Sequence, residues 1–441
     1  MPAQFPAILD GDKALKILWV KAGGLLPLDT GGKIRSYHML GKLSCRHDVT
    51  FFTFYAEHAN DSHGELGRLF TRVISYSLPV SRSKSFGDLA NYARHFFSGQ
   101  PYQIVKYCQA KVAVALRELL KRETFDLIVC DFLVAAGIIP WNLPCPKVLF
   151  THNVEALIWK RHFEVTRSPL WKAISWREWR TTARAERRYL NLADHVLTVS
   201  DADRDCFARL IERAKITVIP TGVDVNFFQP AAGEEQLNAL VFTGSMDWMP
   251  NEDGVFYFVE KILPRIRNQV PDIALLVVGR RPSARLLELS RATAGMQVTG
   301  AVEDIRPYVL RGSVYIVPLR VGSGTRLKIF EAMAMGKAVV STSIGAEGLP
   351  VRPGRDIMIA DSPDEFALAV VGLLQDHARR GRLGRAAREL VVQGHTWDSV
   401  GYQLESVLET VVKSAHKDIR EQLGLEMAGS IVLSEEKGAT D

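Results

Sequence analysis

Short apolar runs alternate with amphipathic stretches along almost the whole chain. In the first half, runs rich in β-branched and aromatic residues without a helical period predict buried strands at 16–20, 49–55, 127–131, 147–153, 195–200 and 216–223. The second half repeats the pattern at 239–246, 273–280, 297–302, 313–319, 338–344 and 356–361. Helical patterns lie between most of these runs. Strands that alternate with helices predict parallel sheets covered by helices on both faces, the α/β class.

The stretch 226–238 contains Pro, Gly and a polar run without a period, which is typical of a linker. A chain of 441 residues is also too long for one ordinary core. We therefore predict two Rossmann-like domains whose cleft, at the carboxyl ends of the strands, holds the ligand. The predicted segments are a first domain (1–228), the linker (229–238), a second domain (239–395), a helix that returns to the first domain (396–413) and a poorly ordered tail (414–441).

The composition, with 47% hydrophobic and 24% charged residues, is normal for a globular enzyme and argues against disorder. The formal charge of +6 suits phosphates, nucleic acid or an acidic membrane face and does not choose among them. The five cysteines have no C-x-x-C spacing, so neither a disulfide framework nor a zinc site is indicated. Reduced thiols and the absence of a signal-peptide pattern at the N-terminus favour a cytoplasmic location. The most apolar run, 125–144, contains Asp126 and Asp131 and ends at prolines, so it does not predict a membrane span.

A glycine-rich loop follows the predicted strand at 313–319. Gly322 and Gly324 flank Ser323, and such a loop can turn several backbone N–H groups toward one anion. Thr325 is the expected N-cap of a helix over 326–335. The free N–H groups of a helix N-terminus also attract phosphate.

Charged residues open this helix. Arg326 and Lys328, in its first turn, are unfavourable to the helix dipole unless an anion is bound there. Glu331 lies on the same face about one turn deeper, where a carboxylate can accept hydrogen bonds from two adjacent hydroxyls, as ribose offers. The spacing therefore predicts a nucleoside diphosphate site. The alternative is a surface helix with a Lys328–Glu331 pair, which the apolar flank at 330–340 disfavours.

The segment GSGTRLKIFEAMAMGKAVVSTSIGAEGL resembles the signature of glycosyltransferase family 4, the retaining GT-B enzymes that use nucleotide sugars. VIPTGVDVNFF, VSDADR and THNVE resemble further segments of that family, so the likeness covers nearly the whole chain. FTGSMDWMPN together with THNVE is similar to sugar transferases of exosortase-associated exopolysaccharide systems. The resemblance implies a GT-B fold, with two Rossmann-like domains that face each other across a cleft.

In the second domain, the resemblance assigns Glu331 to the nucleotide ribose. It assigns Arg326, Lys328 and the loop Gly322–Thr325 to the pyrophosphate. Two departures put the identity of the donor sugar in doubt. The family often has a second glutamate where this chain has Ser323, and it often has an Arg and a Lys in the segment that here reads GSMDWMPN.

In the first domain, the resemblance places the loop of Gly31 and Gly32 against the donor phosphates and the acceptor, and assigns His152 to the donor sugar. It also implies retention at the anomeric carbon without a metal, so we expect no cofactor. Arg326, Lys328 and a helix N-terminus can together stabilise the departing diphosphate.

The sequence thus predicts transfer of a sugar from a nucleotide donor to a glycan or lipid-linked acceptor, in exopolysaccharide or related cell-surface glycan synthesis. Two alternatives stay open. The same scaffold serves nucleotide-sugar epimerases, although no pair of acidic residues at the sugar can be placed here. A non-catalytic GT-B binding protein would fit the departure at Ser323, while the intact Glu331 counts against it.

The run 157–190 mixes four Trp with many Arg and Lys. This composition suits an anionic membrane interface or a lipid-linked acceptor, which predicts a peripheral location at the inner face of the cell membrane. A solvated helix with its Trp side chains in the core is an equal alternative. Nucleic-acid binding is disfavoured because no recognised module is present.

Overall fold

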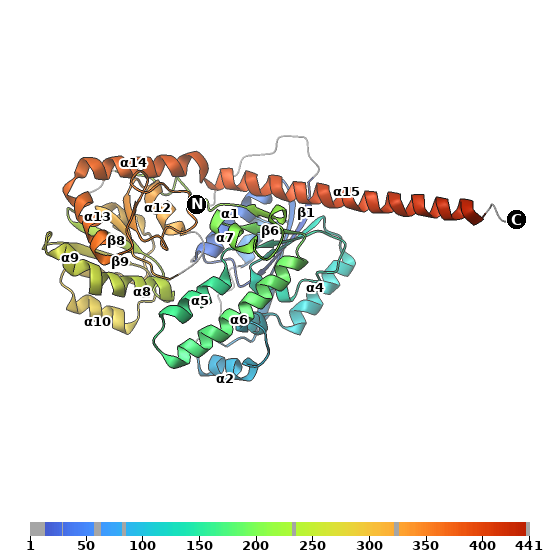
Figure 1. Ribbon diagram of the computed structural model, residues 1–441, viewed down its shortest axis with the longest axis horizontal. Helices are drawn as coiled ribbons and strands as arrows, with labels where there is room; N and C mark the ends of the chain where they lie inside the picture. The colour runs from blue at the N-terminus through green and yellow to red at the C-terminus, as the bar shows by residue number, and fades with distance from the viewer. Residues whose placement is uncertain are drawn as a thin grey trace.

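The computed structural model describes residues 14–28, 30–56, 63–81, 85–231, 235–321 and 326–437. Within these residues two open parallel sheets form two α/β domains (Figure 1). The first sheet has seven strands in the order β3-β2-β1-β4-β5-β6-β7. Its strands are β1 (Lys16–Ala22), β2 (Asp48–Ala56), β3 (Arg72–Leu78), β4 (Leu127–Asp131), β5 (Lys147–Phe150), β6 (His195–Thr198) and β7 (Ile216–Val218).

The second sheet has six strands in the order β10-β9-β8-β11-β12-β13. Its strands are β8 (Ala239–Thr243), β9 (Ala274–Val278), β10 (Met296–Val298), β11 (Val314–Val317), β12 (Ala338–Ser341) and β13 (Met358–Ile359). The predicted GT-B type of architecture, two Rossmann-like α/β domains, is therefore confirmed.

Helices connect the parallel strands and cover the sheets (Figure 1). The first domain contains α1 (Gly31–Leu43), α2 (Phe86–His95), α3 (Tyr102–Tyr107), α4 (Ala110–Arg122), α5 (Glu155–Val165), α6 (Pro169–Leu192) and α7 (Asp201–Phe207). The second contains α8 (Met249–Tyr257), α9 (Leu263–Arg267), α10 (Ala284–Ala292), α11 (Arg306–Arg311), α12 (Leu327–Ala334), α13 (Pro363–Gln375) and α14 (His377–Gly394). Among the helices described here, none is both long and apolar enough to cross a membrane.

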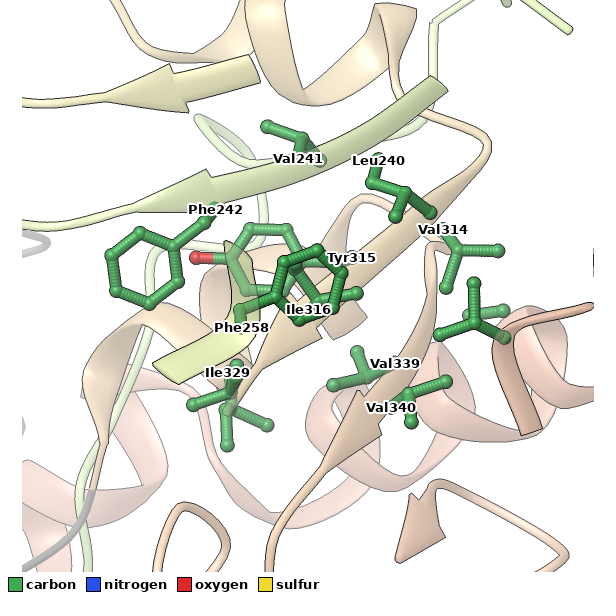
Figure 2. Close-up of a cluster of buried hydrophobic side chains, with 14 of the residues drawn as sticks. Leu240, Val241, Phe242, Phe258, Val314, Tyr315, Ile316, Ile329, Val339 and Val340 are labelled. Atoms are coloured by element: carbon green, nitrogen blue, oxygen red, sulfur yellow. The ribbon is translucent and has the colours of Figure 1, made fainter. Parts of the chain in front are cut away.

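The central strands are buried on both faces, which is why they read as unbroken apolar runs. All five residues of β4 and of β8 are buried. In the second domain, β8, β11 and β12 pack their side chains against α12 around Tyr315 and Phe258 (Figure 2). The edge strand β3 was not predicted, because exposed Arg and Ser residues interrupt the apolar run that marks a central strand.

The last helix, α15 (Trp397–Lys437), crosses back to the first domain and packs on α1. Trp397 stacks on the ring of His38 with 4.8 Å between ring centroids. It also fills the space that a side chain at Gly222 would need, since a Cβ there would lie 2.5 Å from the indole. Farther along the helix, Glu405 accepts an ion pair from Arg46 at 3.1 Å.

The helix does not end near Lys413, so the expected end of the helix, followed by an unstructured tail from 414, is wrong. α15 continues to Lys437. The physical reason lies in the sequence, because 414–437 contains no proline and has apolar residues at 419, 423, 427 and 431, the four-residue spacing of a helix.

Candidate active site

Each sheet has one point at which the order of its strands reverses. In the first sheet this point lies between β1 and β4, and in the second between β8 and β11. Chains that leave such neighbouring strands in opposite directions open a crevice at the carboxyl ends, where α/β proteins bind ligands. Gly31 and Gly32 follow β1, His152 follows β5 beside β4, and the helix with Glu331 follows β11. The predicted residues therefore lie at the two expected edges.

Lys328 lies in the first turn of α12 and points toward the end of β8. Its Nζ donates a hydrogen bond to Oδ1 of Asn251 at 2.8 Å and lies 4.2 Å from the ring centroid of Phe242. The Asn251 amide is itself fixed, because it donates to the backbone oxygen of Ser245 at 2.9 Å. Gly244 leaves room for the ammonium group, since a Cβ there would lie 2.6 Å from it.

This environment changes the charge of the amine. Burial lowers the pKa of Lys328 to about 7, and the neighbouring Arg326 lowers it further, while Glu331 opposes the shift. A neutral amide and an aromatic ring thus hold a cation that has lost most of its water. A bound phosphate would supply the missing counter-charge.

Glu331 lies one turn farther along α12 and is partly exposed. Burial raises the pKa of its carboxyl to about 7, against the influence of Lys328. The side chain makes no hydrogen bond to any residue that the structure describes. The carboxylate is therefore available to accept hydrogen bonds from a ligand, as its predicted ribose role requires.

Arg326 occupies the N-cap position of α12, with φ −94° and ψ 94°. The helix begins at Leu327, one residue later than predicted, so Arg326 precedes the first turn instead of lying within it. Burial lowers the pKa of its guanidinium to about 10, against the carboxylate of Glu347. The loop residues Gly322, Ser323, Gly324 and Thr325 lie outside the described part of the chain, and their donor-binding roles stay predictions. The expected N-cap at Thr325 is wrong, because Arg326 holds that position.

An ion pair joins the two domains beside Arg326. Arg161 on α5 donates two hydrogen bonds to the carboxylate of Glu347, at 2.6 and 2.7 Å. Asp203, at the start of α7, faces the same group, and burial together with Glu347 raises its pKa to about 6. Acidic and basic residues of both domains thus meet at this side of the cleft.

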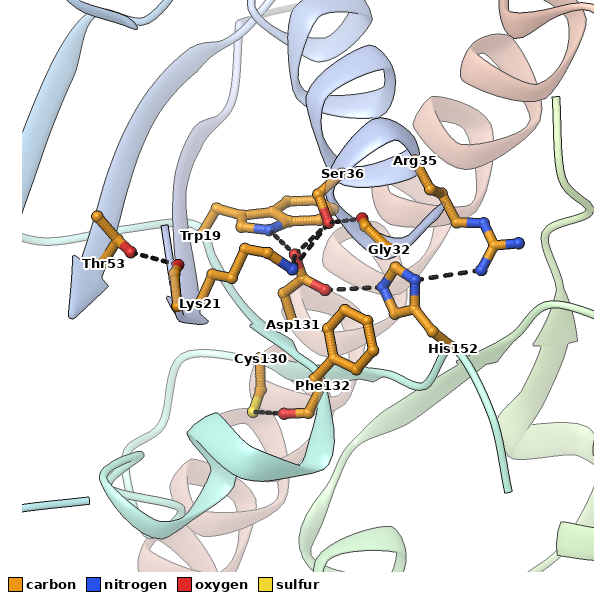
Figure 3. Close-up of polar contacts among 11 residues, drawn as sticks. Trp19, Lys21, Gly32, Arg35, Ser36, Thr53, Cys130, Asp131, Phe132 and His152 are labelled. Atoms are coloured by element: carbon orange, nitrogen blue, oxygen red, sulfur yellow. Dashed lines mark hydrogen bonds and ion pairs between the residues drawn. The ribbon is translucent and has the colours of Figure 1, made fainter. Parts of the chain in front are cut away.

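On the first domain, a buried aspartate organises the polar residues (Figure 3). Oδ2 of Asp131, at the end of β4, accepts hydrogen bonds from Trp19 at 2.9 Å, Lys21 at 3.0 Å and Ser36 at 2.7 Å. Its Oδ1 lies 2.7 Å from Nε2 of His152. Although burial opposes it, the Lys21 ammonium and His152 hold the pKa of Asp131 below its usual value.

His152 therefore has both ring nitrogens engaged. Arg35 donates to its Nδ1 at 3.1 Å, which leaves the proton of a neutral ring on Nε2, facing Asp131. Burial lowers the pKa of His152 to about 3, so the ring is neutral. The predicted hydrogen bond from this side chain to a donor sugar would have to replace one of these bonds, and it stays a prediction.

Gly31 and Gly32 form the first two positions of α1, where backbone N–H groups are free of helical partners. A Cβ on Gly32 would lie 2.6 Å from the ring of Phe132, whereas one on Gly31 would meet no atom within 4 Å. Phe132 has a φ of 70° and stacks on His152 with 3.8 Å between centroids. The requirement for glycine at 32 thus has a packing cause, while Gly31 stays open to the cleft.

One cluster in the described chain has the spacing of metal ligands: His47, Glu405 and Glu409. It lies between α1 and α15, not at the strand ends. The backbone N–H of Leu15 donates to Nδ1 of His47 at 3.2 Å, so the proton of the neutral ring is on Nε2, the atom that faces Glu405. In this tautomer Nε2 carries a proton and has no lone pair to offer a metal.

The sequence did not single out Arg35, Asp131, Arg161, Asn251 or Glu347. Asp131 had a usable signal, because it is a charged residue at the end of a central strand, whereas Asn251 lies within α8 and had none. Arg161 and Glu347 had none, since their pairing depends on how the two domains face each other.

Two models of known protein families match the chain, one over each domain. The model of the Glycosyltransferase Family 4 matches residues 34–227, and that of the Glycosyl transferases group 1 matches 238–376. An "Uncharacterized 44.6 kDa protein in cps region" of Klebsiella pneumoniae is 24% identical over 81% of this chain and 90% of its own length. A phosphatidyl-myo-inositol mannosyltransferase of Mycobacterium tuberculosis is 30% identical over 45% of this chain and 55% of its own length.

Solved structures share the fold at low sequence identity. Sucrose-phosphate synthase from Thermosynechococcus elongatus has a TM-score of 0.69 at 17% identity, over 90% of this chain and 99% of that one. Anabaena Alr3699/HepE, solved in complex with UDP-glucose, has a TM-score of 0.63 at 14% identity, over 90% and 100% of the two chains. The family models cover both domains on either side of the linker, and the chain therefore belongs to the family 4, group 1 glycosyltransferases and has their GT-B fold.

Proposed function

We propose that this glycosyltransferase moves a sugar from a nucleoside diphosphate sugar to a glycan or lipid-linked acceptor, with retention of the anomeric configuration. The observation that carries the proposal is the pair on α12. Lys328 is a half-buried cation that no carboxylate among the described residues reaches within hydrogen-bonding range, and Glu331 is an unused acceptor one turn away. A diphosphate and a ribose satisfy both groups at once.

In this mechanism the bond between the anomeric carbon and the phosphate oxygen breaks, and the diphosphate leaves with nearly two charges. Arg326, Lys328 and the N-terminus of α12 stabilise those charges, so no metal is needed. The acceptor oxygen bonds to the anomeric carbon on the face that the leaving group vacates, and its proton passes to the departing phosphate oxygen. No protein nucleophile takes part.

The first domain closes the site. The free N–H groups at Gly31 and Gly32 face the donor phosphates and the acceptor, and Asp131 and Arg35 hold His152 in a single orientation beside them. The Arg161–Glu347 pair stabilises the closed arrangement. A closed cleft excludes water, which would otherwise hydrolyse the donor.

The names of relatives suggest classes of donor and acceptor to propose for this chain. HepE was solved with UDP-glucose, and a relative from Corynebacterium glutamicum is called a GDP-mannose-dependent mannosyltransferase. The Klebsiella relative is named for its cps region. We therefore propose a UDP- or GDP-sugar donor, an acceptor in cell-surface polysaccharide synthesis, and a cytoplasmic protein that works at the inner face of the membrane.

The test is the melting temperature of the purified chain with UDP, GDP, ADP and their common sugar conjugates, with and without magnesium. We expect one nucleotide to raise the melting temperature without metal, since ligands that bind only the folded state stabilise it. Glu331→Ala should abolish that rise, whereas Glu288→Ala, an exposed glutamate on α10, should leave it unchanged. A shift that survives Glu331→Ala, or that requires magnesium, contradicts the proposed site.

Experiments can distinguish two other functions from that of a transferase. An epimerase would convert the sugar of its nucleotide conjugate without an acceptor, and would need acidic residues poised at the sugar. A non-catalytic binding protein would give no shift with any nucleotide, and its partner would still bind the Glu331→Ala variant.

A further inference from the structure

Helix α2 turns its apolar side chains toward solvent. Phe86, Leu89 and Ala93 follow one another at the three- and four-residue spacing of one helix face, and Phe97 lies just beyond the end. Phe86 is 88% exposed and Phe97 92%. No residue of α2 is buried. The helix therefore presents an apolar face that the described chain does not cover.

The opposite side of α2, which carries Asp88 and Tyr92, is the one that faces the protein. Asp88 accepts hydrogen bonds from Tyr102 and Lys106, both at 2.7 Å. Arg177 on α6 donates to the backbone oxygens of His95 and Phe96, both at 3.0 Å. These bonds fix the orientation of α2, so its outward apolar face is a built feature of the fold and not the result of a loosely attached helix.

The N-terminal half of α6 lies beside α2 (Figure 1). Leu170, Trp171 and Trp176 are all exposed, Trp176 to 52%. The predicted membrane segment 157–190 is thus only partly accessible, because α5 and the inner face of α6 pack on each other. The accessible parts are the start of α6 and the outer side of the same helix, and α2 is a contributor that the sequence did not indicate.

A basic ridge continues along the exposed side of α6. Lys172, Arg180, Arg184 and Arg188 follow at four- and eight-residue spacing, with Arg187 beside them, and all are exposed. The two acidic residues of α6, Glu178 and Glu186, are buried. As far as the structure describes the chain, none of the five basic side chains forms an ion pair.

We propose that the outward face of α2 and the exposed side of α6, together the α2–α6 surface, dock on an anionic lipid bilayer. Apolar and Trp side chains would enter the membrane–water interface while the adjoining Lys and Arg side chains contact lipid phosphates. Interfacial amphipathic helices bind membranes in this way. The surface would hold the cleft close to an acceptor carried by lipid, so it extends the proposed function without requiring it.

A second copy of the chain fits this surface less well. A twofold contact would place the surface of one copy against the same surface of the other. The unpaired basic residues of α6 would then oppose one another, since no acidic residue of the helix is exposed to compensate them. An anionic bilayer satisfies both the apolar and the charged part.

The test is sedimentation of the full chain with vesicles of phosphatidylcholine alone and of phosphatidylcholine mixed with phosphatidylglycerol. We expect binding to the anionic vesicles that weakens as salt rises, and much weaker binding to the neutral ones. Phe86→Ser combined with Phe97→Ser should reduce the partition coefficient at least about tenfold. The matched control, Leu237→Ser with Leu368→Ser, changes two exposed apolar residues elsewhere and should bind as the unmodified chain does.

Charge is tested separately. Arg180→Glu with Arg184→Glu should lower partitioning by about 25-fold or more, since each basic residue at an anionic surface contributes about fivefold. Arg291→Glu, an exposed arginine at the end of α10, is the control. Absence of binding to anionic vesicles, or binding that the Phe86 and Phe97 changes leave intact, overturns the proposal. So does a dimer that these changes dissociate, because that outcome assigns the surface to a second copy.

A measurement on the unmodified chain guards against variants that fail to fold. Vesicles of phosphatidylglycerol with brominated acyl chains should quench tryptophan emission, and Trp171→Phe with Trp176→Phe should remove most of that quenching. Quenching that is unchanged in this variant contradicts the docking surface. Nucleotide-induced stabilisation reports on the transferase site independently, so either proposal can fail while the other stands.

Discussion

Replacing Lys328 by methionine should stabilise the free protein while it removes the response to the donor. The amine has a pKa of about 7 in the folded chain, against an ordinary value of 10.5. Each pKa unit corresponds to about 1.4 kcal/mol, so at neutral pH the buried amine costs the folded state about 4 kcal/mol. Because the side chain is partly exposed, about 2 to 4 kcal/mol is the expected range.

The sign of the effect follows from proton linkage. Between pH 7 and 10.5 the unfolded chain binds a proton at this lysine that the folded chain does not, so the stability of the unmodified protein rises with pH in that window. Lys328→Met should therefore add most stability at or below pH 7. The gain should shrink to about 1 kcal/mol near pH 9.5.

Differential scanning calorimetry across pH 6 to 9.5 measures this. Near pH 7 the melting temperature of Lys328→Met should exceed that of the unmodified chain by about 5 °C or more. The nucleotide-induced shift should be lost in the same variant. Lys261→Met, an exposed lysine outside the cleft, is the control. A lower melting temperature, a gain independent of pH, or a retained nucleotide shift would refute the reasoning.

Three further predictions concern the first domain and the closed cleft. Gly32→Ala should lower the free energy of unfolding, measured in urea, by about 1 to 3 kcal/mol, because its Cβ would lie 2.6 Å from the ring of Phe132. Gly31→Ala should leave the free energy of unfolding unchanged, and equal losses in the two variants would be inconsistent with this packing. His152→Ala should reduce kcat while it preserves the shift in melting temperature caused by the nucleotide alone, and loss of that shift would place the imidazole at the nucleotide. Arg161→Ala and Glu347→Ala should each increase the radius of gyration in small-angle scattering, because each removes the ion pair between the domains. The double variant should show the same increase as either single variant, and an additive increase would show that the two residues act separately.

The fold could be predicted because its central strands are buried on both faces and read as apolar runs, as 127–131 and 239–243 do. The edge strand β3 was missed because its exposed residues interrupt the apolar run by which strands were recognised. The end of α15 was misplaced because the C-terminal tail was expected to be poorly ordered, as chain ends commonly are, although apolar residues continue at helical spacing.

The donor side of the site could be predicted because its groups are close in sequence, within one loop and one helix. Lys328 and Glu331 needed no knowledge of the fold. The other side depends on contacts between distant segments: Asp131 and His152 meet across neighbouring strands, and Arg161 meets Glu347 across the cleft. Such contacts follow from strand order and domain orientation, which hydrophobic patterning does not specify.

The central claim is that Glu331 accepts hydrogen bonds from the ribose of a nucleoside diphosphate. A double-mutant cycle by isothermal titration calorimetry tests it most directly, with Glu331→Ala as the change in the protein and removal of the two ribose hydroxyls as the change in the ligand. The unmodified chain should bind the dideoxy nucleotide about 10- to 100-fold more weakly, since hydrogen bonds to a charged group contribute about 1.5 to 3 kcal/mol. The Glu331→Ala variant should bind both nucleotides equally. If it still discriminates between them as the unmodified chain does, the ribose lies elsewhere and the account is wrong.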